Sequence, residues 1–256
     1  MTPGTVICDL DGVVFVDGDP ISGAGDALHA LEAQGHGLLF VTNNATTHRS
    51  DLVAKIEGAS GYRPALESIF SSAMAGASLI AGDNSTAFVV GEAGLVATLG
   101  DYGIEVSQRW EEAEAVVVGL DRALTYDRIK DAVLAVANGA RFVATNVDST
   151  YPTPQGLWPG GGAIVAAIEK ASGVEPEVAG KPYAPMRQMV REAVGPGPVW
   201  MVGDRPDTDL AMAKLEGWQS VLVLTGVVAS ADDVPAEFAP DLVLKSLAEV
   251  PAAFRS

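Results

Sequence analysis

The chain has 256 residues, 48% of them hydrophobic, and its 33 acidic and 16 basic residues leave a formal net charge of −17. This composition supports one large core or two modest ones, and the lack of a Lys/Arg cluster argues against a nucleic acid polymer as partner. The longest apolar runs are shorter than the roughly 18 to 20 residues of a membrane span and no secretion signal opens the chain, so we expect a cytoplasmic protein without membrane contact.

The first predicted strand, in residues 4–10 (GTVICDL), is an apolar run that ends in carboxylates. Asp9 and Asp11 lie two residues apart, so in an extended strand both side chains point to one face. Burying two like charges is costly unless a positive group stands beside them. The pair therefore predicts a bound cation. The only cysteine, Cys8, has apolar neighbours and is interpreted as a core residue.

Apolar runs and amphipathic segments alternate along the rest of the chain. Further strands are expected within residues 36–42, 86–91, 113–120, 140–145, 197–203 and 219–226, and helices within 23–35, 125–139, 161–173, 183–195 and 206–217. This alternation predicts an α/β fold with a parallel sheet. We find no repeat at a fixed period and no low-complexity tract.

Polar groups follow the apolar runs at four places in the sequence. They are Asp9 to Gly12, Thr42 to Asn44, Lys181 with Pro182, and Asp204 to Asp209. Open parallel sheets bind ligands beyond the carboxyl ends of their strands, so these groups are expected to form one pocket. Carboxylates at 9, 11 and 204 suit Mg²⁺, whereas a lysine, a threonine hydroxyl and the backbone N–H groups of residues 10, 43 and 44 suit phosphate.

In this order, the segments DLDGVV (9–14), VTNN (41–44), GKP (180–182) and GDRPDTD (203–209) resemble the four motifs of the haloacid dehalogenase (HAD) superfamily of phosphohydrolases. Segments such as ATNVDSTYP and EVAGKPYAPM are similar to its class IIA branch, which contains NagD-like and p-nitrophenyl phosphatase-like enzymes. The resemblance runs from about residue 5 to about residue 250. It implies a Rossmann-like, doubly wound catalytic core formed by residues 1–83 together with 178–256, and an inserted α/β (C2-type) cap domain at 84–177.

The resemblance also implies chemical roles for the acidic residues. Asp9 would attack phosphorus and become an aspartyl phosphate, while Asp11 would protonate the leaving oxygen and later take a proton from water. Mg²⁺ would be held by Asp9, by the backbone carbonyl of Asp11 and by Asp204, and Asp209 would orient waters or the lysine from behind.

Phosphate and leaving group would be bound by two further sets of residues. By resemblance, Thr42, Asn43, Asn44 and Lys181 would hold the phosphate, and Asn146, Asp148 and Tyr151 in the cap would select the leaving group. We expect hydrolysis of a small phosphorylated metabolite such as glycerol 3-phosphate or a similar sugar or polyol phosphate, with p-nitrophenyl phosphate as an artificial substrate. Nucleoside monophosphates, phosphoglycolate and pyridoxal phosphate are alternatives. Caps of this type often form the dimer contact in relatives, which makes a homodimer an expectation.

Other interpretations of these motifs remain open from sequence. A phosphate-binding regulatory module would keep the pocket without turnover, although it would not need the acid at Asp11. A receiver-like module would leave much of the chain unexplained, whereas a phosphomutase would share the chemistry. An EF-hand loop starting at Asp9 is disfavoured, because Val13 and Pro20 stand where calcium-binding acids belong. Three glycines at 160–162 precede a helix without a P-loop lysine, and we interpret them as a turn that allows close backbone packing.

Overall fold

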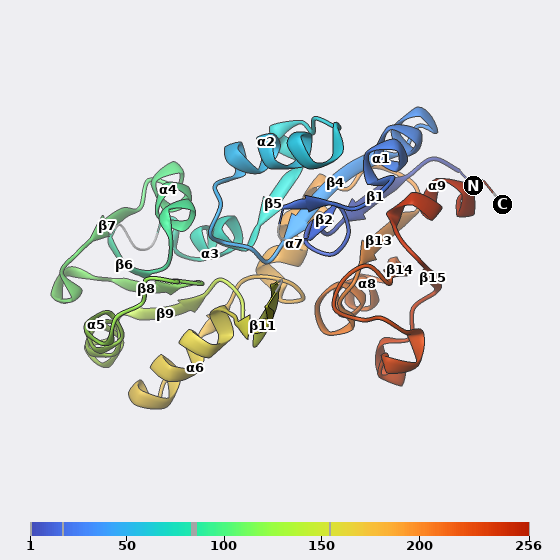
Figure 1. Cartoon of the computed structure of the whole chain (residues 1–256). Coiled ribbons are helices and arrows are strands. Elements are labelled where there is room, and N and C mark those ends of the chain that lie inside the picture. Colours follow the sequence, from blue (N-terminus) through green and yellow to red (C-terminus); the bar gives the residue numbers. More distant parts are fainter. Residues whose placement is uncertain (1, 17, 83–85, 154, 256) are drawn as a thin grey trace. The chain divides into compact units, whose positions relative to one another are not determined.

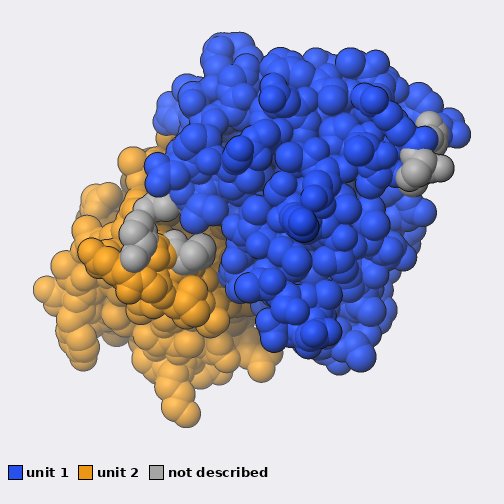
Figure 2. Space-filling view, turned by 45° about the vertical axis from the view of Figure 1, so that its right-hand side comes forward, with its two compact units in different colours: residues 1–42, 50–70, 187–256 blue, residues 43–49, 71–186 orange. Residues whose placement is uncertain are grey.

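The computed structural model of the chain describes residues 2–16, 18–82, 86–153 and 155–255. It divides into two compact units, which Figure 2 colours separately. Unit 1 contains residues 1–42, 50–70 and 187–256, and unit 2 contains residues 43–49 and 71–186. Residues 43–49, 71–83 and 178–186, expected in the catalytic core, group with unit 2 in this division. The functional boundary between core and cap at residues 84 and 177 stays a prediction.

Unit 1 is built on a parallel sheet with the strand order β15-β14-β13-β1-β4-β5 (Figure 1). Strand pairing places β1 between β13 and β4, with all three strands parallel. The carboxyl ends of these strands therefore meet at one edge, as the sequence predicts. The strands are β1 (Thr5–Cys8), β4 (Gly37–Thr42), β5 (Ile69–Ser71), β13 (Val199–Gly203), β14 (Gln219–Val223) and β15 (Leu242–Leu244).

Residues from several strands of unit 1 share one large core. Val6, Cys8 and Val202 belong to a large hydrophobic cluster with leucines of the helices α1 and α2 and one isoleucine of α2. Cys8 is fully buried there, which confirms its interpretation as a core residue. The helices of this unit are α1 (Ala24–Ala33), α2 (Arg49–Ser60), α8 (Ala211–Glu216) and α9 (Val250–Ala253), and α7 (Ala184–Ala193) crosses from unit 2 into unit 1.

Unit 2 contains a second sheet, with the order β12-β9-β8-β6-β7 and parallel pairing throughout. Val89, Val117 and Val143 pack into one core with residues of α3 and α4. The alternate residues of these strands, such as Phe88 and Val116, pack into a second core with residues of α5 and α6. Helices thus cover both faces, which explains why the strands are apolar without interruption. The elements are α3 (Ser72–Ile80), β6 (Thr86–Val90), α4 (Ala93–Asp101), β7 (Glu105–Ser107), β8 (Ala115–Val118), α5 (Tyr126–Ala137), β9 (Arg141–Ala144), α6 (Gly161–Ser172) and β12 (Glu177–Val178).

The remaining elements are short. Two antiparallel pairs lie outside the large sheets, β2 (Phe15–Val16) with β3 (Asp19–Pro20), and β10 (Thr150–Thr153) with β11 (Gly156–Pro159). A π-helical turn, Pro206–Leu210, precedes α8, and short 3₁₀ helices occur at Leu66–Ser68, Trp110–Glu112, Ala231–Asp233, Ala236–Phe238 and Leu247–Glu249. No helix in the described ranges is both long enough and apolar enough to cross a membrane.

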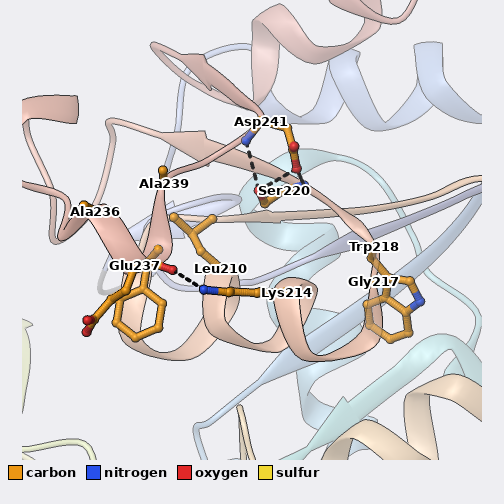
Figure 3. A pocket seen from close by; sticks show the side chains of 10 residues that line it. Leu210, Lys214, Gly217, Trp218, Ser220, Ala236, Glu237, Ala239 and Asp241 are labelled. Carbon is orange, nitrogen blue, oxygen red and sulfur yellow. Dashed lines mark hydrogen bonds between the residues drawn. The ribbon is translucent and has the colours of Figure 1, made fainter.

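A cavity of about 380 Å³ opens on unit 1, and Figure 3 shows its lining. Trp218, Ser220 and Asp241 lie at its wall, at the amino-terminal ends of β14 and β15. Two of its polar groups are already bonded, since Ser220 Oγ donates to Asp241 Oδ2 at 2.9 Å and Lys214 Nζ donates to the Glu237 carbonyl at 2.8 Å. Ligands of parallel sheets bind at the opposite edge, and we assign no function to this cavity.

Candidate active site

Three carboxylates meet at the carboxyl edge of the unit 1 sheet. Asp9, Asp204 and Asp209 each offer an oxygen, and these oxygens lie within 4.8 Å of one another. All three residues are buried, at 6%, 2% and 0% exposure. Asp9 directly follows β1, and its N–H donates to the Val202 carbonyl of β13 at 2.9 Å. Strand pairing therefore carries Asp9 to the end of β13, which Asp204 directly follows.

The Asp204 carboxylate is enclosed by backbone. The Val227 N–H donates to Asp204 Oδ2 at 2.7 Å. A Cβ at Gly12 would lie 2.6 Å from Asp204 Cγ, and one at Gly226 would lie 1.9 Å from Oδ2. Gly12 also has a φ of +86°, which disfavours any side chain there. The two glycines are thus required for Asp204 to occupy its place.

The π-helical turn brings Asp209 back toward the strand that precedes it. The Arg205 N–H donates to Asp209 Oδ2 at 3.1 Å. A Cβ at Gly203 would lie only 2.3 Å from the Asp209 carboxyl carbon. Because Gly203 ends β13, the missing side chain lets Asp209 approach the strand end. Its carboxylate consequently lies beside those of Asp9 and Asp204, where it can either bind a metal or support these two acids.

Asp11 lies in a tight loop after Asp9. The Leu10 carbonyl accepts the N–H groups of Val13 and Val14 at 3.2 and 2.9 Å, and Asp11 forms an isolated bridge with Phe15. Asp11 is partly exposed, and its carboxylate lies outside the three-carboxylate cluster. The loop therefore separates one buried acid from one that solvent reaches, which suits different roles for the two.

The cluster fits a hard divalent cation. Three buried carboxylates without a cation would repel one another in poorly solvated surroundings. The donors are all oxygens, which Mg²⁺ prefers. The neighbouring thiol does not compete, because burial, reinforced by the charge of Asp9, raises the pKa of Cys8 to about 12 and keeps it protonated.

Two family models match this chain. One, described as haloacid dehalogenase-like hydrolase, covers residues 6–105, and the other, described as HAD-hydrolase-like, covers residues 178–250. Together they span more than half of the sequence and contain all three clustered carboxylates. The chain belongs to the haloacid dehalogenase-like hydrolases. The resemblance that the four motifs indicated is therefore confirmed.

Solved members of the family share this hydrolase's fold over nearly its whole length. The p-nitrophenyl phosphatase from Archaeoglobus fulgidus is 32% identical, with a TM-score of 0.90, and the match covers 98% of this chain and 100% of that one. The glycerol phosphate phosphatase from Mycobacterium tuberculosis, solved in complex with magnesium, is 34% identical with a TM-score of 0.85, covering 95% of this chain and 74% of that one. The α/β fold and the p-nitrophenyl phosphatase-like branch are thereby confirmed.

A curated relative extends the comparison to sequence. It is the D-glycerol 3-phosphate phosphatase of Mycobacterium tuberculosis, 38% identical over 239 residues. The match covers 91% of the hydrolase described here and 66% of the relative. The chain thus spans about two thirds of that relative's length.

The predicted phosphate-binding residues of the hydrolase are divided between the two units. Thr42 ends β4 in unit 1 and is buried. Asn43, Asn44 and Lys181 lie in unit 2, where Lys181 is 3% exposed. The Asn44 side chain accepts the N–H and the hydroxyl of Thr46 at 2.8 and 2.7 Å, which closes a turn after β4.

Unit 2 also brings together three predicted site residues, Asn43, Asn146 and Asp148, whose mutual contacts the sequence did not indicate. The Asn43 amide nitrogen lies 3.2 Å from Asp148 Oδ1 and 3.2 Å from the Lys181 carbonyl. Asn146 Nδ2 donates to the Asn43 carbonyl at 2.7 Å. The sequence predicted only backbone contacts for Asn43. Nothing local indicates these side-chain bonds, because the partners lie more than a hundred residues away.

Tyr151 lies in the β10–β11 hairpin, apart from this hydrogen-bonded group. Its ring meets Trp158 edge to face at 6.3 Å. Trp158 and Leu157 are exposed. The glycines at 160–162 pack against the preceding loop, since a Cβ at Gly160 would lie 2.3 Å from the Asp148 carbonyl. This contact confirms their interpretation as a close backbone turn.

Proposed function

We propose that this hydrolase cleaves small phosphomonoesters with Mg²⁺ and Asp9 as the nucleophile. The buried group of Asp9, Asp204 and Asp209 carries the proposal, because a nucleophilic carboxylate here stands beside two further metal-binding acids. Asp9, Asp204 and Asp209 would hold the metal, together with the Asp11 carbonyl that the family resemblance implies. When bound, Mg²⁺ would offset the charges of phosphate and carboxylates.

The chemical step follows from the residues of the loop after β1. An Asp9 carboxylate oxygen bonds to phosphorus, and the bond between phosphorus and the ester oxygen breaks. Asp11 gives its proton to the departing oxygen. Water then attacks the phosphorus of the aspartyl phosphate, Asp11 takes a proton from this water, and the phosphorus–Asp9 bond breaks to release phosphate. The partial exposure of Asp11 supports its contact with water.

Phosphate binding is assigned to Thr42, Asn43, Asn44 and Lys181. The buried lysine supplies a cation, and the backbone N–H groups of the loop after β4 supply donors. Asn146, Asp148 and Tyr151 are assigned to leaving-group selection. In this assignment residues 84–177 act as the cap, and a homodimer in the cytoplasm is the expected form of the enzyme.

A small polyol phosphate, such as glycerol 3-phosphate, is the proposed substrate. The similarity to a protein named D-glycerol 3-phosphate phosphatase supports it. Asp148 also supports it, because a carboxylate accepts hydrogen bonds from substrate hydroxyls. Sugar phosphates, nucleoside monophosphates, phosphoglycolate and pyridoxal phosphate are the alternatives that a substrate panel separates.

The test is phosphate release from p-nitrophenyl phosphate and from these small esters, with and without Mg²⁺. We expect Mg²⁺-dependent turnover that falls by at least a thousandfold in Asp9→Asn, which keeps the side chain's shape and removes its nucleophilicity. Asp19→Asn, the same change at an exposed residue of β3, is the matched control. Absence of turnover on every ester, together with measurable phosphate binding, would replace the enzyme with a binding module.

A further inference from the structure

The Asn43 side chain is bonded to two segments of unit 2 at once. Its Oδ1 accepts the Lys181 N–H at 2.7 Å, and its Nδ2 donates to the Lys181 carbonyl at 3.2 Å. An amide and a peptide group thus pair through two hydrogen bonds. Both bonds use the Lys181 backbone, so Asn43 fixes the position of the backbone from which the lysine side chain extends.

Gly180, the residue before the lysine, leaves the space that this pairing needs. A Cβ at Gly180 would lie 2.5 Å from Asn43 Oδ1 and 2.6 Å from the Thr145 carbonyl. The Gly180 N–H donates to that same carbonyl at 2.8 Å. Glycine is therefore needed at 180 for the Asn43 side chain to reach the backbone of Lys181.

The same amide nitrogen also binds the loop after β9. Asn43 Nδ2 lies 3.2 and 3.3 Å from the two carboxylate oxygens of Asp148. Nδ2 has two hydrogens, so one serves the Lys181 carbonyl and the other is shared by the carboxylate. The charge on Asp148 strengthens this second bond.

The backbone of Asn43 is held as firmly as its side chain. Its carbonyl accepts Ser72 Oγ at 2.6 Å and Asn146 Nδ2 at 2.7 Å. Asn146 Oδ1 in turn accepts the Asp148 N–H at 3.1 Å. Asn146 and Asp148 therefore bind the carbonyl and the side chain of one residue.

The loop that carries Asn43 is anchored farther along on α4. The Gly94 N–H donates to the Thr46 carbonyl at 3.2 Å, and His48 Nε2 lies 2.8 Å from Asp101 Oδ2. These contacts belong to unit 2, as do Asn43, Asp148 and Lys181. The loop that carries the Asn43 amide is therefore held in place, which a positioning role requires.

We propose that Asn43 is a positioning residue that fixes the phosphate-binding lysine and the leaving-group loop relative to each other. The proposal rests on the proposed function, in which Lys181 binds phosphate and Asp148 contacts the leaving group. Placing both on one amide makes phosphate binding and substrate selection depend on a single side chain. Loss of this amide therefore weakens hydrolysis of a polyol phosphate more than hydrolysis of p-nitrophenyl phosphate, whose leaving group lacks the aliphatic hydroxyls.

The decisive experiment exchanges the two side-chain types. Asn43→Asp removes the donor and places a second carboxylate against Asp148. Asp148→Asn removes the charge but leaves an acceptor. In the double variant Asn43→Asp/Asp148→Asn, the amide at 148 can donate to the carboxylate at 43, which still accepts the Lys181 N–H. We measure kcat and KM for glycerol 3-phosphate and p-nitrophenyl phosphate in all four proteins.

We expect Asn43→Asp to lower kcat/KM for glycerol 3-phosphate by about a hundredfold, since hydrogen bonds to charged groups are among the stronger ones. The double variant should recover about tenfold of this loss, mainly through KM. Asn138→Asp, the same change at an exposed residue after α5, should match the wild type. If the two substitutions change kcat/KM by factors that simply multiply in the double variant, the proposal is overturned, because residues that do not interact show no coupling.

A second measurement separates this inference from the proposed function. Hydrogen exchange of the backbone around Lys181 should accelerate at least tenfold in Asn43→Ala, because that variant leaves the Lys181 N–H without its acceptor. Unchanged exchange would contradict the network itself. A wild type that turns over no ester would refute the phosphatase, whereas an active wild type with unimpaired Asn43 variants would refute only the positioning role.

Discussion

Gly226 leaves the space that the Asp204 carboxylate occupies. A Cβ at Gly226 would lie 1.9 Å from Asp204 Oδ2 and 2.6 Å from Asp204 Cβ, so the whole acidic side chain would have to move. The adjacent Val227 N–H fixes the same oxygen at 2.7 Å. Gly226 has no positive φ, so its effect on Asp204 is one of space alone. The position of the Asp204 carboxylate thus depends on the absence of a side chain at Gly226.

Gly226→Ala should therefore lower metal affinity while the fold is retained. We expect the Mg²⁺ concentration for half-maximal turnover to rise at least tenfold. Gly58→Ala provides the control, because a Cβ there meets nothing within 4 Å in α2 and should stabilise the helix by about 1 kcal/mol. A normal Mg²⁺ requirement in Gly226→Ala would show that Asp204 does not ligate the metal.

Metal binding should also stabilise the protein, and this effect does not depend on turnover. Asp9, Asp204 and Asp209 repel one another until a cation binds, and a ligand of the native state stabilises by about 2.7 kcal/mol at a hundred times its Kd. Mg²⁺ should raise Tm in the wild type and much less in Asp209→Asn. That variant should have the higher Tm without metal, since it removes one of three crowded charges.

The Tm of Asp209→Asn with and without Mg²⁺ also tests whether this residue binds the metal directly. A Mg²⁺-induced rise in Tm equal to that of the wild type would return Asp209 to the supporting position that the sequence suggested. Asp19→Asn, at an exposed residue of β3, should leave both the Tm and its response to Mg²⁺ unchanged.

The strands and the chemistry at their ends were predictable because both are local properties. Continuous apolar runs indicated β1 and β13, and the acids that follow them stand next to those runs in the sequence. The helix α3 was not predicted. Its residues are mostly small and buried on nearly every side, so no apolar stripe distinguishes it. Periodicity indicates a helix only where one side remains polar.

Contacts between distant segments could not be predicted in the same way. The place of Asp209 in the acid cluster depends on a π-helical turn and on the absence of a side chain at Gly203. Likewise, the partners of the Asn43 side chain lie 105 and 138 residues away. The motifs identify which residues matter, whereas these contacts determine whether a residue binds a ligand or supports another residue.

His36 should make the stability of the protein depend on pH. It is 6% exposed and packs against the rings of Trp200 and Phe254, and burial lowers its pKa below 6.5. Between the lowered folded pKa and the unfolded value, the unfolded chain binds more protons. The free energy of unfolding should therefore fall as pH drops below about 6.5, by up to about 1.4 kcal/mol per pH unit.

Denaturant unfolding of the wild type and His36→Gln at pH 7.5 and pH 5.5 measures this contribution. The wild type should lose more stability between these two values than the variant does. His29→Gln is the control, because His29 lies on α1 outside this buried cluster. Equal losses in the wild type and His36→Gln would show that His36 does not carry the dependence.

Glu216 should contribute more to stability than the exposed ion pairs do. Its side chain is only 4% exposed and lies at the end of α8, where Arg187 and Arg191 of α7 donate to it at 2.9 Å and 2.6 Å. The hydrogen bonds from Arg191 lower the pKa of Glu216. Glu216→Gln leaves both guanidinium groups without their counter-charge. A hydrogen bond to a charged group contributes roughly 1.5 to 3 kcal/mol, and we expect a loss of about 2 kcal/mol because Arg191 is largely exposed.

The comparison is Glu57→Gln, which removes the charge from an ion pair with Arg63 whose side chains are both exposed. That change should cost no more than about 1 kcal/mol. Because the folded pKa of Glu216 is lowered, its contribution is complete above pH 4.5 and disappears as pH falls through the folded value. Denaturant unfolding at pH 7 and at pH 3.5 should therefore show a large difference between wild type and Glu216→Gln at pH 7 and a smaller one at pH 3.5. A difference that is equal at both values would mean that the glutamate stabilises through its shape and packing, not through its charge.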